Sequence, residues 1–91
     1  MLILVSYDVP NDRRRTRLAH TLKDYGQRVQ YSVFECNLEE AQLARLRSRV
    51  EKLIEATEDS VRIYLLCRGC AERLEIQGLG VATRDPDMYV L

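Results

Sequence analysis

Hydrophobic and polar residues follow one another along this 91-residue chain with two periods, one typical of strands and one typical of helices. The nearly continuous apolar run over residues 2–7 predicts a strand covered on both faces, and Pro10 disfavours its continuation. Residues 13–25 carry apolar side chains three and four positions apart, which predicts an amphipathic helix. We expect Asp12 to cap the amino end of this helix and Gly26 to cap its carboxyl end in a left-handed conformation.

The rest of the chain shows the same two periods. Residues 28–37 are rich in β-branched and aromatic side chains, and they predict one long strand or two short strands broken near Ser32. A second amphipathic helix is expected over residues 39–57, followed by an alternating strand over residues 60–67 with Cys67 on its inward side. The tail is expected to form a turn near residues 71–74 and short strands near residues 75–77 and 88–91.

This order of elements predicts a fold of the α+β class. Two helices alternating with three or four strands are typical of a ferredoxin-like βαββαβ sandwich, here with an extra C-terminal strand. The length fits one domain over residues 1–91, because a second core would leave each half too small. Helices on one face of a sheet leave the other face open, so we expect two copies to pack sheet to sheet as a homodimer.

Composition places the chain among ordinary cytoplasmic domains. Fourteen basic residues balance fourteen acidic ones, and no apolar run approaches the roughly 20 residues that span a bilayer. We therefore expect a cytoplasmic protein without a membrane partner. Cys67 and Cys70 form a C-x-x-C pair, but a structural zinc site needs four ligands and only Cys36 and His20 remain, so we favour packing over metal binding.

The basic residues are distributed unevenly. Twelve of the fourteen are arginines, and four of these lie within five positions at the predicted start of the first helix: Arg13, Arg14, Arg15 and Arg17. Cations there oppose the helix dipole, at a cost of about 0.3–1 kcal/mol each. A phosphate backbone would relieve this conflict, because helix amides and guanidinium groups would converge on one anion. The alternative is that one or two of these arginines pair with Asp8, Asp12 or Glu35 and the rest are solvated.

Asp8 is the strongest candidate for chemistry. It lies at the carboxyl end of the first predicted strand, where loops carry function on a fixed scaffold. Its carboxylate is a hard oxygen ligand suited to Mg²⁺, with Mn²⁺ as the alternative. One carboxylate is too few for a firm site, so Asp12 or the Asp8 of a symmetry-related copy would have to supply a second. Asp8 could instead simply end the strand or cap a turn.

Three blocks of sequence carry a resemblance to a known family. They are Tyr7-Asp8-Val9 with Asp12-Arg13-Arg14, the block from Tyr25 to Glu35 (YGQRVQYSVFE), and Ile63-Tyr64-Leu65-Leu66-Cys67. Together they span nearly the whole chain, and the middle block is far more specific than a short motif. In these blocks the chain resembles the Cas2 family, the small CRISPR-associated endoribonucleases that form part of the CRISPR adaptation machinery.

The resemblance implies a site and a cellular role. It implies a homodimer in which the tail over residues 75–91 extends the partner's sheet, and in which both Asp8 carboxylates face one divalent metal, usually Mg²⁺. It also implies that Ser32 and Phe34 lie in the active-site strand as catalytic positions. Arg14, its neighbours in the cluster and Arg28 would hold the nucleic-acid backbone. The implied role is spacer acquisition in antiviral defence, with a CRISPR integrase subunit as partner.

Three functions remain open at this point. The first is a metal-dependent endonuclease that cuts phosphodiester bonds in single-stranded RNA, double-stranded DNA or both. The second is a non-catalytic DNA-binding scaffold that bridges integrase dimers. The third is a ferredoxin-like interaction module or a related toxin-type ribonuclease. We favour a spacer-acquisition protein with Mg²⁺-dependent nuclease activity.

Overall fold

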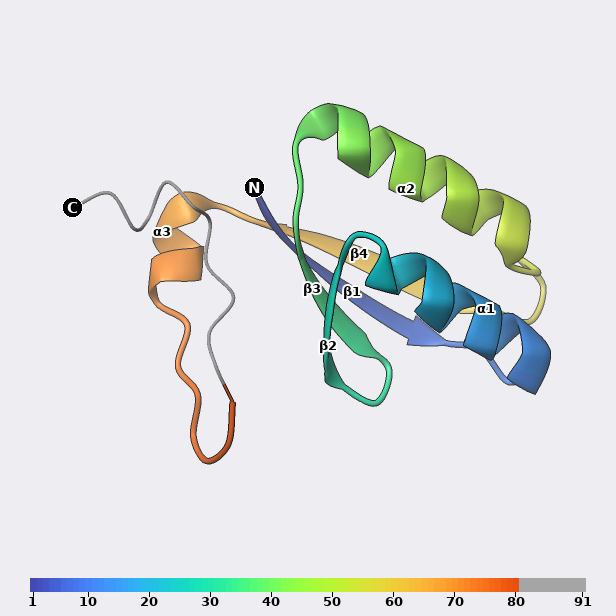
Figure 1. The fold of residues 1–91 in the computed structure, drawn as a ribbon, viewed down its shortest axis with the longest axis horizontal. Helices are drawn as coiled ribbons and strands as arrows, with labels where there is room; N and C mark the ends of the chain where they lie inside the picture. The colour runs from blue at the N-terminus through green and yellow to red at the C-terminus, as the bar shows by residue number, and fades with distance from the viewer. Residues whose placement is uncertain (81–91) are drawn as a thin grey trace.

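The computed structural model describes residues 1–80 and contains a single four-stranded antiparallel sheet in this part of the chain. The elements follow the order β1 (Leu2–Asp8), α1 (Asp12–Lys23), β2 (Gly26–Gln30), β3 (Val33–Asn37), α2 (Glu40–Leu53), β4 (Ser60–Leu66) and α3 (Arg68–Glu72). The strands lie in the order β2-β3-β1-β4, and α1 and α2 run along one side of the sheet (Figure 1). This arrangement confirms the predicted α+β, ferredoxin-like fold.

The two faces of the sheet differ in character. On the central strand β1, Ile3, Val5 and Tyr7 are buried against the helices, whereas Asp8 is exposed. Side chains alternate between the faces of a strand, so the even-numbered residues of β1 point to the side that carries neither α1 nor α2. Asp8 therefore lies on the helix-free face of the sheet.

The core forms where the buried face of the sheet meets the two long helices. Phe34 and Cys36 on β3 pair in register with Val5 and Ile3 on β1, and all four side chains are fully buried. The helices add apolar residues at helical spacing, among them Leu18, Leu22, Leu43, Leu46 and Val50. β1 is held between β3 and β4 and packs on this core with its buried face, which fixes the position of its last residue, Asp8.

Both predicted caps of α1 prove to be wrong. The N-cap is Asn11, whose side chain accepts a hydrogen bond from the Arg14 amide at 3.0 Å, and Asp12 is the first helical residue. The helix ends at Lys23 with Asp24 as C-cap in a right-handed conformation. Gly26 instead begins β2, where an added Cβ would lie against the Glu35 carbonyl oxygen and 2.6 Å from Cys36 Sγ. Gly26 is thus required by a close approach of two strands.

The segment over residues 28–37 forms two strands. β2 and β3 are joined by a tight connection at Tyr31 and Ser32, so the break lies near Ser32, one of the two possibilities that the sequence left open. A register shift between Arg28 and Gln30 interrupts the regular pairing of these strands. The helix expected over residues 39–57 is shorter, because α2 ends at Leu53.

The chain beyond β4 differs from the prediction. β4 ends at Leu66, and Cys67 is the exposed N-cap of α3, so the prediction of an inward, packed Cys67 is wrong. The expected turn near residues 71–74 is present at the end of α3, where the Leu74 amide donates to the Ala71 carbonyl oxygen at 3.3 Å. Residues 75–77 form no strand in the described part of the chain. The strand expected over residues 88–91 lies outside the described residues. Across residues 1–80, no helix combines the length and apolar character needed to cross a membrane.

Candidate metal and nucleic-acid site

Asp8 lies at the end of the longest strand pairing in the sheet. β1 and β4 pair along their whole length, and Asp8 lies opposite Ser60 at the last position of the ladder. A hollow of about 270 Å³ opens there, lined by Asp8 and Ser60 together with Ser6, Tyr7, Arg62 and Tyr64. An exposed carboxylate, two hydroxyl-bearing serines and an arginine thus converge on one concave surface.

Arg62 and Tyr64 were missed as site residues by the sequence reasoning. A hydrogen bond to the Tyr64 side chain raises the pKa of Arg62, whose guanidinium lines the same hollow as Asp8. The signal that could have found them was the alternation along β4, which already placed Arg62 and Tyr64 on the side opposite Val61 and Ile63. The sequence alone does not reveal the antiparallel register, which pairs Ser60 with Asp8 and Arg62 with Ser6.

The second carboxylate of the proposed metal site is not supplied by the neighbouring loop. Asp12, one of the two candidates, forms an ion pair with Arg15. Among residues 1–80 there is no group of three His, Cys, Asp or Glu side chains placed to hold a metal ion. At the Asp8 end of the sheet, a single copy of the described chain therefore offers one unpaired carboxylate, Asp8, beside the hydroxyl groups of Ser6 and Ser60.

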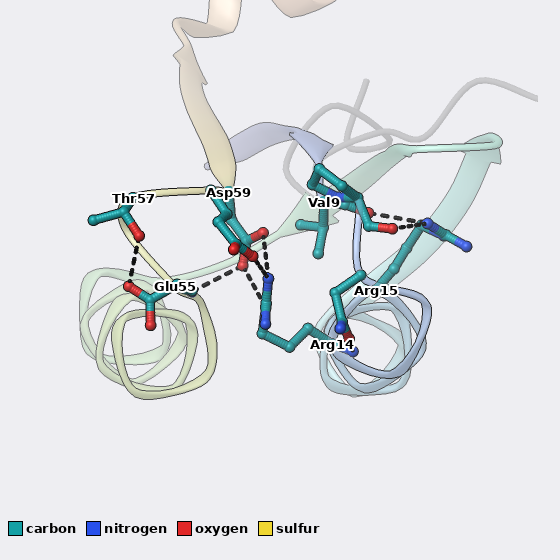
Figure 2. A network of polar contacts seen from close by, with 9 residues as sticks. Val9, Arg14, Arg15, Glu55, Thr57 and Asp59 are labelled. Atoms are coloured by element: carbon teal, nitrogen blue, oxygen red, sulfur yellow. Dashed lines mark hydrogen bonds and ion pairs between the residues drawn. The ribbon is translucent and has the colours of Figure 1, made fainter.

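Arg14 is occupied by a network inside the fold (Figure 2). Its Nε and Nη2 atoms donate to the Asp59 carboxylate at 2.8 and 3.2 Å, and Nη2 also donates to Glu58 at 2.6 Å. The Asp59 side chain is fully shielded from solvent and also accepts the Glu55 amide at 2.8 Å. These partners lower the pKa of Asp59, with the Arg14 hydrogen bond as the main cause.

This network has a consequence for Asp8. Arg14 belongs to the first turn of α1, which follows Asp8 along the chain, and Asp59 immediately precedes Ser60, which pairs with Asp8. The ion pair therefore links the start of α1, which follows β1, to the loop before β4, and both segments lie next to the Asp8 end of the sheet. We interpret Arg14 as a positioning residue for this end, which differs from the sequence expectation that it holds a phosphate.

The arginine cluster divides into two pairs. Arg15 donates to the Val9 carbonyl oxygen at 3.0 Å and pairs with Asp12, so it too is engaged within the fold. Arg13 and Arg17 are exposed and form no ion pair with any described residue. Arg15 thus has the predicted partner Asp12, whereas Arg14 pairs with Glu58 and Asp59 and not with the predicted partners. Phosphate binding by Arg13 and Arg17 stays a prediction.

The remaining predicted site residues lie at different depths. The Ser32 carbonyl oxygen accepts the Tyr7 amide at 3.1 Å, which places the β2–β3 turn one residue from Asp8. Phe34 is fully buried on the helix side of the sheet and cannot touch a ligand at Asp8, so it acts only through packing. Arg28 lies on the same side, with its guanidinium carbon 5.5 Å from the centre of the Phe34 ring.

Comparison with known proteins identifies the family of this chain. A family model described as CRISPR associated protein Cas2 matches residues 1–74. A CRISPR-associated endoribonuclease Cas2 of Chloroflexus aurantiacus is 42% identical, with 100% of this chain and 98% of that protein covered. A CRISPR-associated endonuclease Cas2 of Thermus thermophilus is 47% identical, with 99% of this chain and 96% of that protein covered.

Solved structures agree with these relatives. The crystal structure of Streptococcus pyogenes Cas2 superposes with a TM-score of 0.71 at 42% identity, covering 86% of this chain and 100% of that chain. A chain of a structure titled as a partial Cas6-RT-Cas1–Cas2 complex superposes with a TM-score of 0.72 at 28% identity, covering 82% and 88%. The match over residues 1–74 and the full-length relatives together show that this chain belongs to the CRISPR-associated Cas2 family.

Proposed function

We propose that this chain is a CRISPR-associated endonuclease of spacer acquisition that cuts phosphodiester bonds with the help of a divalent cation at Asp8. The observation that carries the proposal is the exposed Asp8 carboxylate at the end of β1, in a hollow that it shares with Ser60 and Arg62. Relatives of similar length carry the names endoribonuclease and endonuclease, which supports the same class of reaction here.

The site becomes complete only with a second copy. One chain contributes a single free carboxylate, and Asp12 is occupied by Arg15. Asp8 lies on the helix-free face, which is the face that would pack in a sheet-to-sheet homodimer. A two-fold axis through such an interface would bring the same residue from both copies to one place, so we propose that two Asp8 carboxylates hold one Mg²⁺ or Mn²⁺ ion.

The surrounding residues then have separate tasks. When bound, the cation supplies a water of lowered pKa and stabilises negative charge on the scissile phosphate. Arg62 would offer a positive charge to the same phosphate, because a guanidinium group is always protonated and this one lines the Asp8 hollow. Ser32 does not line the hollow and contacts it only through the bond from the Tyr7 amide to its carbonyl oxygen, whereas the free arginines Arg13 and Arg17 would hold the strand outside it.

The test compares two aspartates of the same segment. End-labelled single-stranded RNA and duplex DNA are incubated with the wild type, Asp8→Asn and Asp12→Asn, each with Mg²⁺ and with chelator. Cleavage that requires Mg²⁺, disappears in Asp8→Asn and persists in Asp12→Asn supports the proposal. Cleavage that survives Asp8→Asn contradicts it, provided that size-exclusion chromatography shows the same dimer for all three proteins.

A second candidate is a scaffold without catalysis. A solved complex whose title joins Cas1 and Cas2 contains a chain of this fold, which favours an integrase subunit as a partner here as well. In that function the protein positions DNA between integrase copies, and Asp8 is dispensable. Retained capture of DNA by an integrase complex with Asp8→Asn, together with no cleavage by the wild type, would favour the scaffold over the nuclease.

A further inference from the structure

A second concave surface lies on the helix side of the sheet, away from the Asp8 hollow. It encloses about 310 Å³ between α1, β2 and the β2–β3 turn. Four basic side chains and two tyrosines line most of it: Arg15, His20, Lys23, Arg28, Tyr7 and Tyr31. None of the described residues that line this cationic hollow is acidic. Because Arg15 is paired with Asp12, the cations of this hollow that are available to an anion are Lys23 and Arg28.

The helical repeat of α1 creates the shape of the cationic hollow. Arg15, Ala19 and Lys23 lie four residues apart and so share one side of the helix. Ala19 is small and nearly buried, which leaves open space between the two cations on either side of it. His20 lies on the next row of the same helix, and Lys23 forms no ion pair with any described residue.

The opposite wall is held in place by aromatic contacts. Arg28 reaches from β2 across the Phe34 ring, at 5.5 Å from its centre, and this contact fixes its guanidinium beside α1. The buried Tyr7 hydroxyl donates to the Tyr31 carbonyl oxygen at 3.4 Å, which holds the turn. The Tyr31 side chain itself is 73% exposed at the rim. An exposed aromatic ring beside a group of cations suits a base with its phosphate.

From this geometry we infer that the cationic hollow binds one nucleotide of a single-stranded nucleic acid, with its phosphate between Lys23 and Arg28 and its base stacked on Tyr31. The volume of about 310 Å³ lies at the small end of ligand sites of about 300–1,000 Å³, which favours a small ligand unit such as one nucleotide. A paired base in a duplex is stacked inside the helix and cannot reach Tyr31. The inference deepens the proposed nuclease by naming where its substrate strand is held, and it rests on that proposed function.

The helix dipole offers another explanation for the basic residues at the end of α1, but it does not account for the whole cationic hollow. His20 and Lys23 lie in the last turn of the helix, where the dipole favours cations. This effect accounts for neither Arg28 on a different element nor the exposed tyrosine at the rim. A ligand with one phosphate and one aromatic base accounts for all four residues together.

Binding is measured in chelator, so that cleavage does not contribute. Fluorescence anisotropy of a labelled single-stranded RNA and of a duplex is followed against salt for the wild type and for Lys23→Gln with Arg28→Gln. The matched control is Arg45→Gln with Arg47→Gln, which removes the same charge from exposed positions of α2. Loss of the one phosphate contact lowers the salt slope for single strands by about 0.7, which is about 5-fold in affinity at 0.1 M salt.

Further variants test the phosphate contact and the base stacking separately. Lys23→Gln alone lies at an exposed helix position and should lower the slope by part of this 0.7, which guards against an indirect effect of losing Arg28 packing. Tyr31→Ala should weaken single-strand binding about 5-fold or more and leave duplex binding unchanged. Equal losses in the α2 control, or equal losses for duplex after Tyr31→Ala, would overturn the inference. A protein that shows these effects but never cleaves would support the inference and contradict the proposed nuclease.

Discussion

Gly26 offers the sharpest test of how the sheet is assembled. It begins β2 and pairs with Cys36, and a Cβ at this position would lie 2.8 Å from Cys36 Cα and 2.6 Å from Cys36 Sγ. Cβ atoms in proteins essentially never approach other atoms within 3.0 Å, and part of this obstruction is backbone, which cannot rotate away. Gly26→Ala should therefore push β2 off β3 and displace Arg28 with it.

The expected size follows from overpacking. Forcing an extra methyl group into a filled space costs about 1–3 kcal/mol, and the backbone obstruction here favours the upper end, about 3 kcal/mol. For a domain of this size, that cost lowers the melting temperature by about 12–24 °C. Differential scanning calorimetry at one fixed protein concentration measures it, because dimerisation would otherwise shift the transition.

Gly69 is the matched control for this substitution. It lies in α3 with no atom within 4 Å of an added Cβ and with no positive φ, so Gly69→Ala changes the same chemical group in open space. Alanine in a helix is favoured over glycine by about 0.5–1 kcal/mol, so this variant should melt at or slightly above the wild type. Melting temperatures of Gly26→Ala and Gly69→Ala within about 4 °C of each other would refute the reasoning.

The paired and free side chains give further predictions. Arg14→Gln should lower the melting temperature and leave the salt slope of nucleic-acid binding unchanged, whereas Arg13→Gln should keep the melting temperature and lower the slope by about 0.7–0.9. The pKa of Asp59 is lower in the folded state than the value of about 3.9 expected in the unfolded state. The ionised Asp59 carboxylate therefore stabilises the fold above about pH 3.9, and this stabilisation is lost as the pH falls through the folded-state pKa. The melting difference between wild type and Asp59→Asn should thus shrink below about pH 4, and a constant difference down to pH 2 would contradict the ion pair. Burial raises the pKa of the Cys36 thiol to about 11, whereas hydrogen bonds from the Cys70 amide and side chain lower the pKa of the Cys67 thiol. Iodoacetamide at pH 8 should therefore label Cys67 in the native protein and Cys36 only after unfolding. Peptide mass spectrometry measures this difference.

Periodicity was sufficient to predict the fold from the sequence. The apolar run of β1 and the helical spacing of α1 and α2 each report burial against one core, and that core forms as predicted. Element ends were less accurate, because Asn11 and Asp12 are adjacent and are both good N-caps. At Cys67 the strand alternation simply ended one residue early, where α3 begins.

Interactions between distant segments could not be predicted. Gly26 follows a helix, which suggested a left-handed cap, but the need for glycine comes from Cys36 on the neighbouring strand. Arg14 is likewise paired with Asp59, 45 residues away in sequence, and only the packing of α1 beside the loop before β4 brings them together. Charge spacing alone therefore could not separate the paired arginines of the cluster from the free ones.

Metal stoichiometry tests the central claim, a divalent ion shared by two Asp8 carboxylates, most directly. Isothermal titration with Mn²⁺ is carried out on the dimer for the wild type, Asp8→Asn and Asp12→Asn. The shared site predicts one ion per two chains in the wild type and in Asp12→Asn, and no ion at this site in Asp8→Asn. One ion per chain, or the same binding after Asp8→Asn, would contradict the account.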